Sequence, residues 1–294
     1  MTRLLRLLLL ALCLPLLVGA QTKTTVHPKY GSNPAAGHWF THDGVKLYYE
    51  VYGAGEPLLL IHGNGGSISD MRRQIAFFRK KYKVIAMDSR DQGKSADSPD
   101  KLTYEKMTSD QAALLDHLKA GPAYVLGWSD GGIEALVLAM KYPDKVKKVA
   151  AMAANLNPTD QALHPDVVKL IKDWVAFVPP EKRQTAEGKR ELKVTGMMLE
   201  EPNIPVEALE AIQASTLVLA SDHDMIRDDH TVNIYHHIPN SELVIFPGAT
   251  HMIPFDDPAT FNATVAKFFA KPFVKIDRIK DTMKSLDKLR SNAD

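Results

Sequence analysis

The sequence has 294 residues, a formal net charge of +1 at pH 7, a hydrophobic fraction of 45% and a single cysteine, Cys13. The near-neutral charge gives no electrostatic basis for binding nucleic acid, and a single cysteine excludes an intramolecular disulfide. The length is enough for one large α/β domain that a conventional hydrophobic core stabilises.

Residues 1–20 have the pattern of a secretory signal peptide. Two arginines in "MTRLLR" precede the apolar "LLLLALCLPLLVG", and small residues precede Gln21. This apolar core is shorter than the ~20 residues that a membrane-spanning helix needs. The alternatives are an uncleaved anchor and a lipid-modified Cys13, although Leu12 stands where a lipoprotein signal would carry a small residue. We therefore expect an extracytoplasmic protein, periplasmic or secreted, with no stable membrane span after cleavage.

The next two segments differ in character. Residues 21–37 are polar and contain proline and glycine, which indicates a linker or an extended N-terminal arm. Residues 38–53 contain two short strands around a turn at Asp43-Gly44, and this pattern predicts a β-hairpin.

From about residue 57 onward, short apolar runs alternate with helical patterns. Continuous apolar runs are typical of strands that are buried on both faces of a sheet. The alternation predicts an α/β fold with a mostly parallel central sheet and helices on both faces, over residues 38–270. The expected strands are "PLLLIHG", "KVIAMDSR", "AYVLGW", "KKVAAMA", "TLVLAS" and "ELVIFPG", with helices at about 70–82, 107–118, 130–142 and 228–238 and from Asp257-Pro258 onward.

Two segments fall outside this alternation. Residues from about 155 to 210 carry helical patterns and a Pro179-Pro180 pair, which predicts a small helical cap inserted between two strands. Residues 271–294 predict a C-terminal amphipathic helix. Because its polar face mixes acids with bases, we expect this helix to pack on the body or on a neighbouring subunit rather than on a membrane. The oligomeric state stays open.

Ser129 is the leading candidate for a catalytic residue. It lies in "GWSDGG", between a buried strand and a helical pattern. A strand, Gly-x-Ser-x-Gly and a helix together predict a nucleophile elbow, in which the serine sits at a tight turn below a helix N-terminus. The alternative is an ordinary glycine-rich turn.

His251 and Asp224 are the expected base and acid. Each follows a predicted parallel strand, so both should lie with Ser129 at the carboxyl edge of the sheet. His251 could accept the serine proton, and Asp224 could fix its tautomer. Asp222 is the alternative acid, and His62 is interpreted as structural. The remaining candidates are expected to be loop or helix-surface residues: His223, His230, His236 and His237.

An oxyanion hole needs two backbone N–H groups near the serine. The loop "HGNGGS" after a buried strand offers Asn64, with Gly65 as a substitute, and Asp130 offers the second group. The alternative is a tight turn without a catalytic donor. Hypotheses for the pocket lining are Trp128, Asn155, Met197 and Met198.

Motifs that would indicate binding of a phosphate, a dinucleotide or a metal are incomplete. "DQGKS" lacks the first glycine of a phosphate-binding loop, because Asp88 stands in its place. "GNGGSI" and "GAGEPL" lack the third glycine of a dinucleotide fingerprint. No cluster has the spacing of metal ligands. We therefore expect neither a cofactor nor a metal.

The motifs "HGNGGS", "DSRDQGKS", "GWSDGG", "ASDHDMI" and "PGATHMIP" occur in the order and spacing of the α/β-hydrolase superfamily, which the sequence resembles over about 38–270. Within it, the sequence looks like the small serine esterase and carboxylic-ester hydrolase branch with a short cap. The resemblance implies Ser129 as nucleophile, Asp224 as acid and His251 as base. It argues against haloalkane dehalogenases and soluble epoxide hydrolases, which use an aspartate nucleophile. One departure is Asp91, where the family more commonly has glycine in a largely structural loop.

These features predict a serine hydrolase that cleaves carboxylic esters or related acyl bonds of a small molecule through an acyl-enzyme. The same residues could serve C–C bond hydrolysis or aminopeptidase-type amide cleavage, and the cap would decide between these reactions. An alternative of a different class is a non-catalytic binding or sensor protein. The complete set of serine, histidine and aspartate argues against it.

Overall fold

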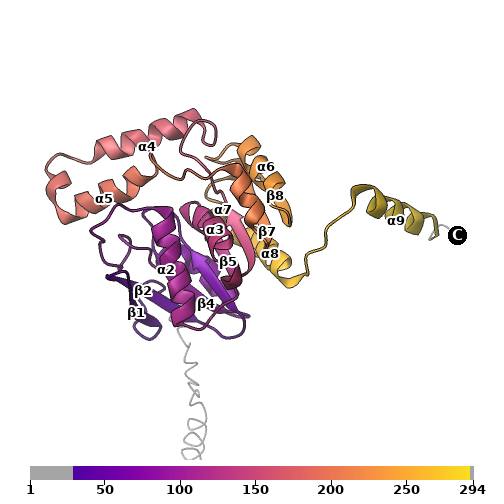
Figure 1. The fold of residues 1–294 in the computed structure, drawn as a ribbon, viewed down its shortest axis with the longest axis horizontal. Coiled ribbons are helices and arrows are strands. Elements are labelled where there is room, and N and C mark those ends of the chain that lie inside the picture. Colours follow the sequence, from indigo (N-terminus) through magenta and orange to yellow (C-terminus); the bar gives the residue numbers. More distant parts are fainter. Residues whose placement is uncertain (1–28, 292–294) are drawn as a thin grey trace, which may run out of the picture.

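The computed structural model describes residues 29–291, so the predicted signal peptide at 1–20 lies outside the described residues. Within the described range, one eight-stranded sheet has the order β1-β2-β4-β3-β5-β6-β7-β8 (Figure 1). β1 and β2 form an antiparallel hairpin, β2 runs antiparallel to β4, and the other neighbours are parallel. The predicted mostly parallel sheet is confirmed. The strands are β1 Gly37–His42, β2 Val45–Tyr52, β3 Pro57–Ile61, β4 Lys83–Met87, β5 Ala123–Trp128, β6 Val146–Met152, β7 Ser215–His223 and β8 Ser241–Thr250.

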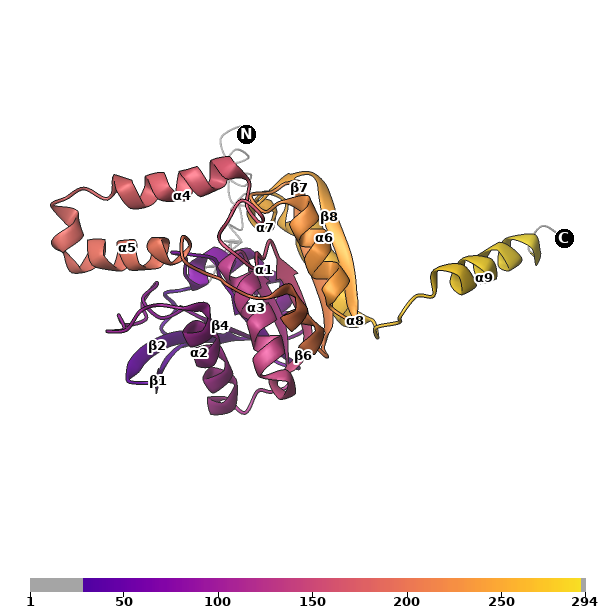
Figure 2. The same ribbon diagram turned by 45° about the horizontal axis from the view of Figure 1, so that its top comes forward.

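Helices cover both faces of the sheet, and each face has its own core (Figures 1 and 2). Successive residues of β3 alternate between the cores: Leu59 and Ile61 pack with α2, α3 and α6, whereas Leu58 and Leu60 pack with α1 and α8. The body helices are η1 Ile68–Met71, α1 Arg72–Phe78, α2 Tyr104–His117, α3 Asp130–Lys141, η2 Pro143–Lys145, α6 Asp228–His237, α7 Ile253–Asp256 and α8 Pro258–Ala270.

The described part of the predicted arm is not extended. Residues 29–36 form turns that fold back on β2. The buried carboxylate of Glu50 accepts hydrogen bonds from the backbone N–H of Gly31 at 2.7 Å and of Asn33 at 3.0 Å. A buried carboxylate needs such donors, and this requirement fixes the segment against the body.

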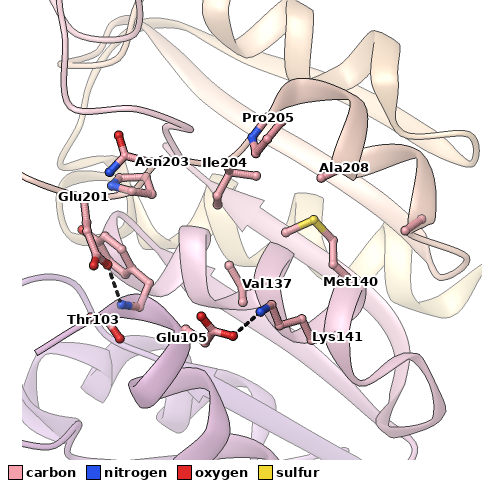
Figure 3. A pocket seen from close by; sticks show the side chains of 13 residues that line it. Thr103, Glu105, Val137, Met140, Lys141, Glu201, Asn203, Ile204, Pro205 and Ala208 are labelled. Atoms are coloured by element: carbon pink, nitrogen blue, oxygen red, sulfur yellow. Dashed lines mark hydrogen bonds and ion pairs between the residues drawn. The ribbon is translucent and has the colours of Figure 1, made fainter.

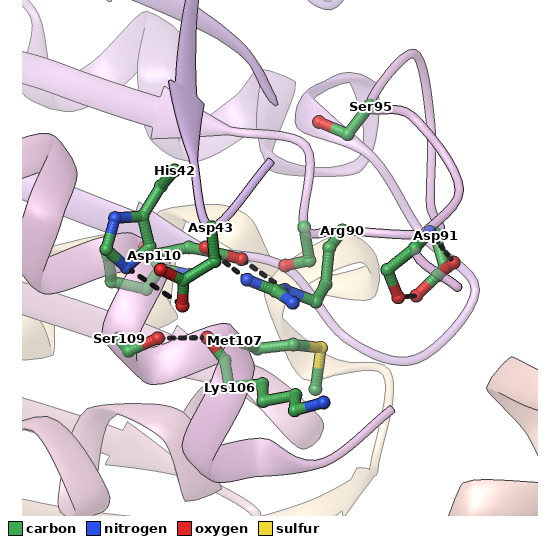
Figure 4. A network of polar contacts seen from close by, with 12 residues as sticks. His42, Asp43, Arg90, Asp91, Ser95, Lys106, Met107, Ser109 and Asp110 are labelled. Atoms are coloured by element: carbon green, nitrogen blue, oxygen red, sulfur yellow. Dashed lines mark hydrogen bonds and ion pairs between the residues drawn. The ribbon is translucent and has the colours of Figure 1, made fainter. Parts of the chain in front are cut away.

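Buried charged side chains stabilise the loop after β4 (Figure 4). Arg90 forms a two-pronged ion pair with Asp110 of α2, with both N–O distances at 2.6 Å and both side chains almost fully buried. Asp91 has a φ of +62°, in the left-handed region that favours glycine. Its carboxylate accepts hydrogen bonds from the backbone N–H and the hydroxyl of Ser98. These bonds stabilise the turn that glycine would form without strain.

The predicted cap is a helical insertion between β6 and β7. α4 (Pro165–Phe177) and α5 (Ala186–Met197) form an antiparallel pair that projects beyond the body, with η3 (Lys182–Gln184) at the turn (Figures 1 and 2). η4 (Val206–Ala211) leads back to the sheet. The cap therefore lies at the carboxyl end of β6.

The C-terminal helix begins later than predicted and does not pack on the body. α9 spans Arg278–Ser291, and it begins where the Asp277 side chain accepts hydrogen bonds from the N–H groups of Ile279 and Lys280. No residue of α9 is buried, and the helix stands apart from the body (Figures 1 and 2). Of the two expected positions, packing on its own body is not seen, and packing on a neighbouring subunit stays a prediction. Among residues 29–291, no helix has the length and apolar character to cross a membrane.

Candidate active site

Ser129 lies at a sharp turn between β5 and α3. Its φ of +59° is unusual for a residue with a side chain, and such strain is typical of functional turns. The turn needs glycine on both sides, because a Cβ at Gly127 would collide with the carbonyl of Gly131, and one at Gly131 with that of Ile61. The chain therefore presents the serine hydroxyl at the N-terminus of α3.

His251 lies directly after β8 and reaches Ser129. Its Nε2 is 3.0 Å from the Oγ of Ser129. The indole N–H of Trp128 donates a hydrogen bond of 2.9 Å to the backbone carbonyl of His251, and the two rings lie 5.5 Å apart. Trp128 thus holds the histidine loop against the serine turn, a role that the sequence did not indicate.

Asp224 lies at the opposite side of the imidazole. Its Oδ1 is 2.6 Å from the Nδ1 of His251, and backbone N–H groups of Ser221, Met225 and Ile226 donate to the same carboxylate. Asp222, the alternative acid, instead accepts hydrogen bonds from the backbone of β8 at Gly248 and Ala249. The structure therefore brings Ser129, His251 and Asp224 together and leaves Asp222 out.

Asn64 joins three parts of the site. Its side-chain amide donates to the Asp130 carboxylate and to the backbone carbonyl of Val194 in α5, each at 2.9 Å. Asp130 is buried, and burial raises the pKa of its carboxyl. The first N–H groups of a helix have no intrahelical acceptor, which leaves the Asp130 N–H available beside the serine. Asn64 is thus fixed by its side chain, a contact that the glycine-rich loop did not indicate.

His62 and His230 make contacts of their own with the backbone. The Nε2 of His62 accepts a hydrogen bond from the backbone N–H of Ser89, in agreement with a structural role. His230 is not on the helix surface as expected. It is buried, and its Nε2 accepts a hydrogen bond from the N–H of Leu156 at 3.0 Å.

A groove of about 420 Å³ opens from Ser129 to solvent between the cap and the body. A compartment of about 50 Å³ adjoins it and includes Asn155. Trp128 and Met198 line the groove as hypothesised, whereas the lining residues from α4 and from the loops at Met225 and Met252 have no local signal in the sequence. The groove is lined by Asn64, Gly65, Trp128, Ser129, Ile171, Trp174, Phe177, Glu191, Thr195, Met198, Met225, His251 and Met252.

The hypothesis for Met197 needs correction. Met197 packs in the core with Val194 and is almost fully buried. Successive helical residues point about 100° apart, so Met197 and Met198 at the end of α5 face different surroundings. Of these two methionines, only Met198 lines the groove and the adjoining compartment.

A separate cavity of about 530 Å³ lies between α2, α3 and η4 (Figure 3). Tyr104 and Glu201 line both this cavity and the small compartment at Ser129. The Glu201 carboxylate accepts a hydrogen bond from the Tyr104 N–H at 3.1 Å. This contact lies between the cavity and the serine.

In the described part of the chain, no group of acidic, histidine or cysteine side chains could hold a metal ion.

Comparison with known proteins gives consistent matches. A profile of the family described as alpha/beta hydrolase fold matches residues 56–191. The human serine hydrolase BPHL is 28% identical over 248 residues, covering 77% of this chain and 84% of the relative. The 3-oxoadipate enol-lactonase 2 of Acinetobacter baylyi is 34% identical over 111 residues, covering 37% and 42%. The crystal structure of MGS-M2, an alpha/beta hydrolase enzyme from a Medee basin deep-sea metagenome library, superposes with a TM-score of 0.72 at 20% identity, covering 82% and 100%.

The strand order, the serine turn and the inserted cap define an enzyme of the hydrolase class with an α/β fold. The chain has the α/β-hydrolase fold, and it is similar to enzymes of the α/β-hydrolase superfamily.

Proposed function

We propose that the protein is a serine hydrolase that cleaves carboxylic esters or related acyl bonds. The observation that carries this proposal is the pair of contacts that joins Ser129 Oγ, His251 and Asp224, at 3.0 and 2.6 Å. Serine is a weak nucleophile until an adjacent base accepts its proton. Ser129, Asp224 and His251 follow three different strands, β5, β7 and β8. Their hydrogen-bonded arrangement has no evident structural purpose.

In the acylation step, Ser129 Oγ attacks the carbonyl carbon and its proton moves to His251 Nε2. Asp224 holds the imidazole in the tautomer that leaves Nε2 free, and it stabilises the imidazolium that forms. The tetrahedral intermediate collapses when the C–O bond to the leaving group breaks. His251 returns its proton to the departing oxygen, and an acyl ester remains on Ser129.

Deacylation follows the same path with water as the nucleophile. His251 takes a proton from water, the hydroxide oxygen attacks the acyl carbon, and the proton passes to Ser129 Oγ as the acid is released. The negative charge of both intermediates lies near the N-terminus of α3. We assign the backbone N–H groups of Asn64 and Asp130 as its donors, because Asn64 is fixed by its side chain and Asp130 begins the helix.

The relatives support this class of reaction. One is named a serine hydrolase and another an enol-lactonase, and a lactone is a cyclic ester. Open access from solvent to Ser129 along the groove fits a small-molecule substrate.

The test is hydrolysis of 4-nitrophenyl acetate by His251→Ala and Asp224→Asn. We expect kcat/KM to fall on the order of 10⁴-fold in both, because His251→Ala removes the base and Asp224→Asn no longer holds the imidazole in the tautomer that leaves Nε2 free. Asp222→Asn is the matched control, since this neighbouring carboxylate accepts hydrogen bonds from the β8 backbone, whereas Asp224 is the carboxylate that contacts the His251 imidazole. Wild-type turnover in His251→Ala or in Asp224→Asn would refute the assignment of that residue to the catalytic site.

We also propose that residues 1–20 direct the protein out of the cytoplasm and are then removed. The support is the basic, apolar and small-residue order of that segment. Mass spectrometry of the N-terminus from the producing cell would test it. Retention of Met1 would contradict cleavage.

A further inference from the structure

The cap helix α4 exposes an unusual amount of apolar surface. Trp174 is 46% exposed and Phe177 is 84% exposed, and they lie three residues apart on one side of the helix. Contiguous exposed apolar side chains are uncommon unless they bind something. Ile171, one turn before Trp174, is buried and continues the same side toward the body.

This apolar side leads directly to the proposed nucleophile. Ile171, Trp174 and Phe177 form one wall of the groove of about 420 Å³ that ends at Ser129 and His251. Methionines from three other segments face them: Met198, Met225 and Met252. Methionine is flexible and polarisable, so this wall adapts to an aliphatic chain without one fixed shape.

The compartment that adjoins the groove at Ser129 is small. It measures about 50 Å³, a volume on the scale of a few water molecules, and it borders Asp130 and Glu201. A long substituent of a bound substrate cannot enter this compartment. It therefore has to lie in the outer groove against α4.

We propose that the groove under α4 binds an aliphatic chain of the substrate, so that the preferred substrates are esters with one small side and one long apolar side. This inference rests on the proposed function at Ser129. The occupant is part of the substrate, because the apolar wall is continuous with the serine and histidine. Trp174 is a specificity-determining residue, since it lines the groove between the buried Ile171 and the exposed Phe177 along α4.

The experiment uses two ester series, because the chain could belong to the acyl or the alcohol side. One series is ethyl acetate, ethyl butyrate and ethyl octanoate, and the other is ethyl, butyl and octyl acetate, so that the second side of each ester stays small, and proton release follows hydrolysis in both. The variants are Trp174→Ala, the conservative Trp174→Phe, and Leu170→Ala. Leu170 is the matched control, because it is an exposed apolar residue of α4 that does not line the groove.

In the wild type, the long chain should raise kcat/KM at least about tenfold in one of the two series, and that series identifies the side that lies in the groove. Trp174→Ala should remove most of this gain, so that the ratio of long-chain to acetate kcat/KM falls toward one. Trp174→Phe should retain the gain, and Leu170→Ala should behave as the wild type. Because Trp174 is half exposed, its replacement does not endanger the core.

Two results would overturn the inference. One is equal kcat/KM for short and long chains in both series. The other is a long-chain preference that Trp174→Ala leaves intact or that Leu170→Ala removes equally. Both outcomes include measurable acetate hydrolysis, so they are distinguishable from failure of the proposed function, in which wild-type and Ser129→Ala proteins would be equally inactive on acetate.

Discussion

Lys193 of the cap helix α5 lies 2.9 Å from the carboxylate of Asp91, the buried residue with the left-handed backbone in the loop after β4. The next residue, Val194, accepts the amide hydrogen bond of Asn64 through its backbone carbonyl. Adjacent residues of the cap are thus joined to two different loops of the body. One of those loops carries a proposed oxyanion donor, so the position of the cap and the geometry of the site are linked.

Lys193→Met should destabilise the protein. The substitution leaves Asp91 buried with only the two Ser98 donors, and we expect the free energy of unfolding to fall by about 1–3 kcal/mol. Urea unfolding measures this loss. Lys189→Met, at an exposed lysine of the same helix, should change stability little. Equal stability of both variants would show that the ion pair does not hold the cap.

Asn64→Ala should slow turnover more than it weakens binding. The variant keeps the backbone N–H but loses the side-chain bonds to Asp130 and Val194 that fix it. We expect kcat on 4-nitrophenyl acetate to fall by about 10–10²-fold with little change in KM, which is less than the loss of a whole donor. A rise in KM at constant kcat would instead place Asn64 in substrate binding alone.

Glu50→Gln should loosen the N-terminal turns. The Glu50 carboxylate accepts from two backbone N–H groups and from the hydroxyls of Tyr48 and Tyr52, each at 2.7–3.0 Å. Burial and this carboxylate raise the pKa of both tyrosines. An amide offers one acceptor oxygen fewer, so we expect a loss of about 1–3 kcal/mol in the free energy of unfolding. Glu56→Gln, at an exposed ion pair, should cost less than about 1 kcal/mol.

His230 should make stability sensitive to acid. Burial lowers its pKa from 6.5 to about 4. Between these values the unfolded chain binds a proton that the folded chain does not, so stability is full above pH 6.5 and decreases as the pH falls toward 4. His230→Gln keeps an acceptor for the Leu156 N–H and does not titrate. Its urea midpoint should therefore fall less between pH 7 and pH 5 than the wild-type midpoint.

His236→Gln is the control for this comparison, because His236 is exposed on the same helix. It should follow the wild type at every pH. Parallel pH dependence in wild-type and His230→Gln proteins would contradict the role assigned to the buried imidazole.

The sequence could predict the fold and the central contacts because both follow from strand ends. Parallel strands place their carboxyl ends on one edge, so residues that directly follow them, such as Ser129, Asp224 and His251, meet there. The choice of Asp224 over Asp222 agrees with the contacts in the structure, where only Asp224 touches the imidazole. The positions of α2, α3, α6 and α8 followed from apolar periodicity in the same way.

What the sequence could not predict depends on tertiary side-chain contacts. No local pattern indicates that the Asn64 amide reaches Val194, or that Lys193 reaches Asp91, because both contacts join segments about a hundred or more residues apart. The separation of Met197 from Met198 depends on how α5 is rotated against the body. The start of α9 does have a local signal in the capping side chain of Asp277, which apolar periodicity alone does not reveal.

The central claim is that His251 activates Ser129 as a nucleophile. It is tested most directly by fluorophosphonate labelling of the folded protein, with the labelled residue located by mass spectrometry. We predict a single label on Ser129 in the wild type, and labelling slower by orders of magnitude in folded His251→Ala. An unlabelled Ser129 in the wild type, or equally fast labelling in His251→Ala, would contradict the account.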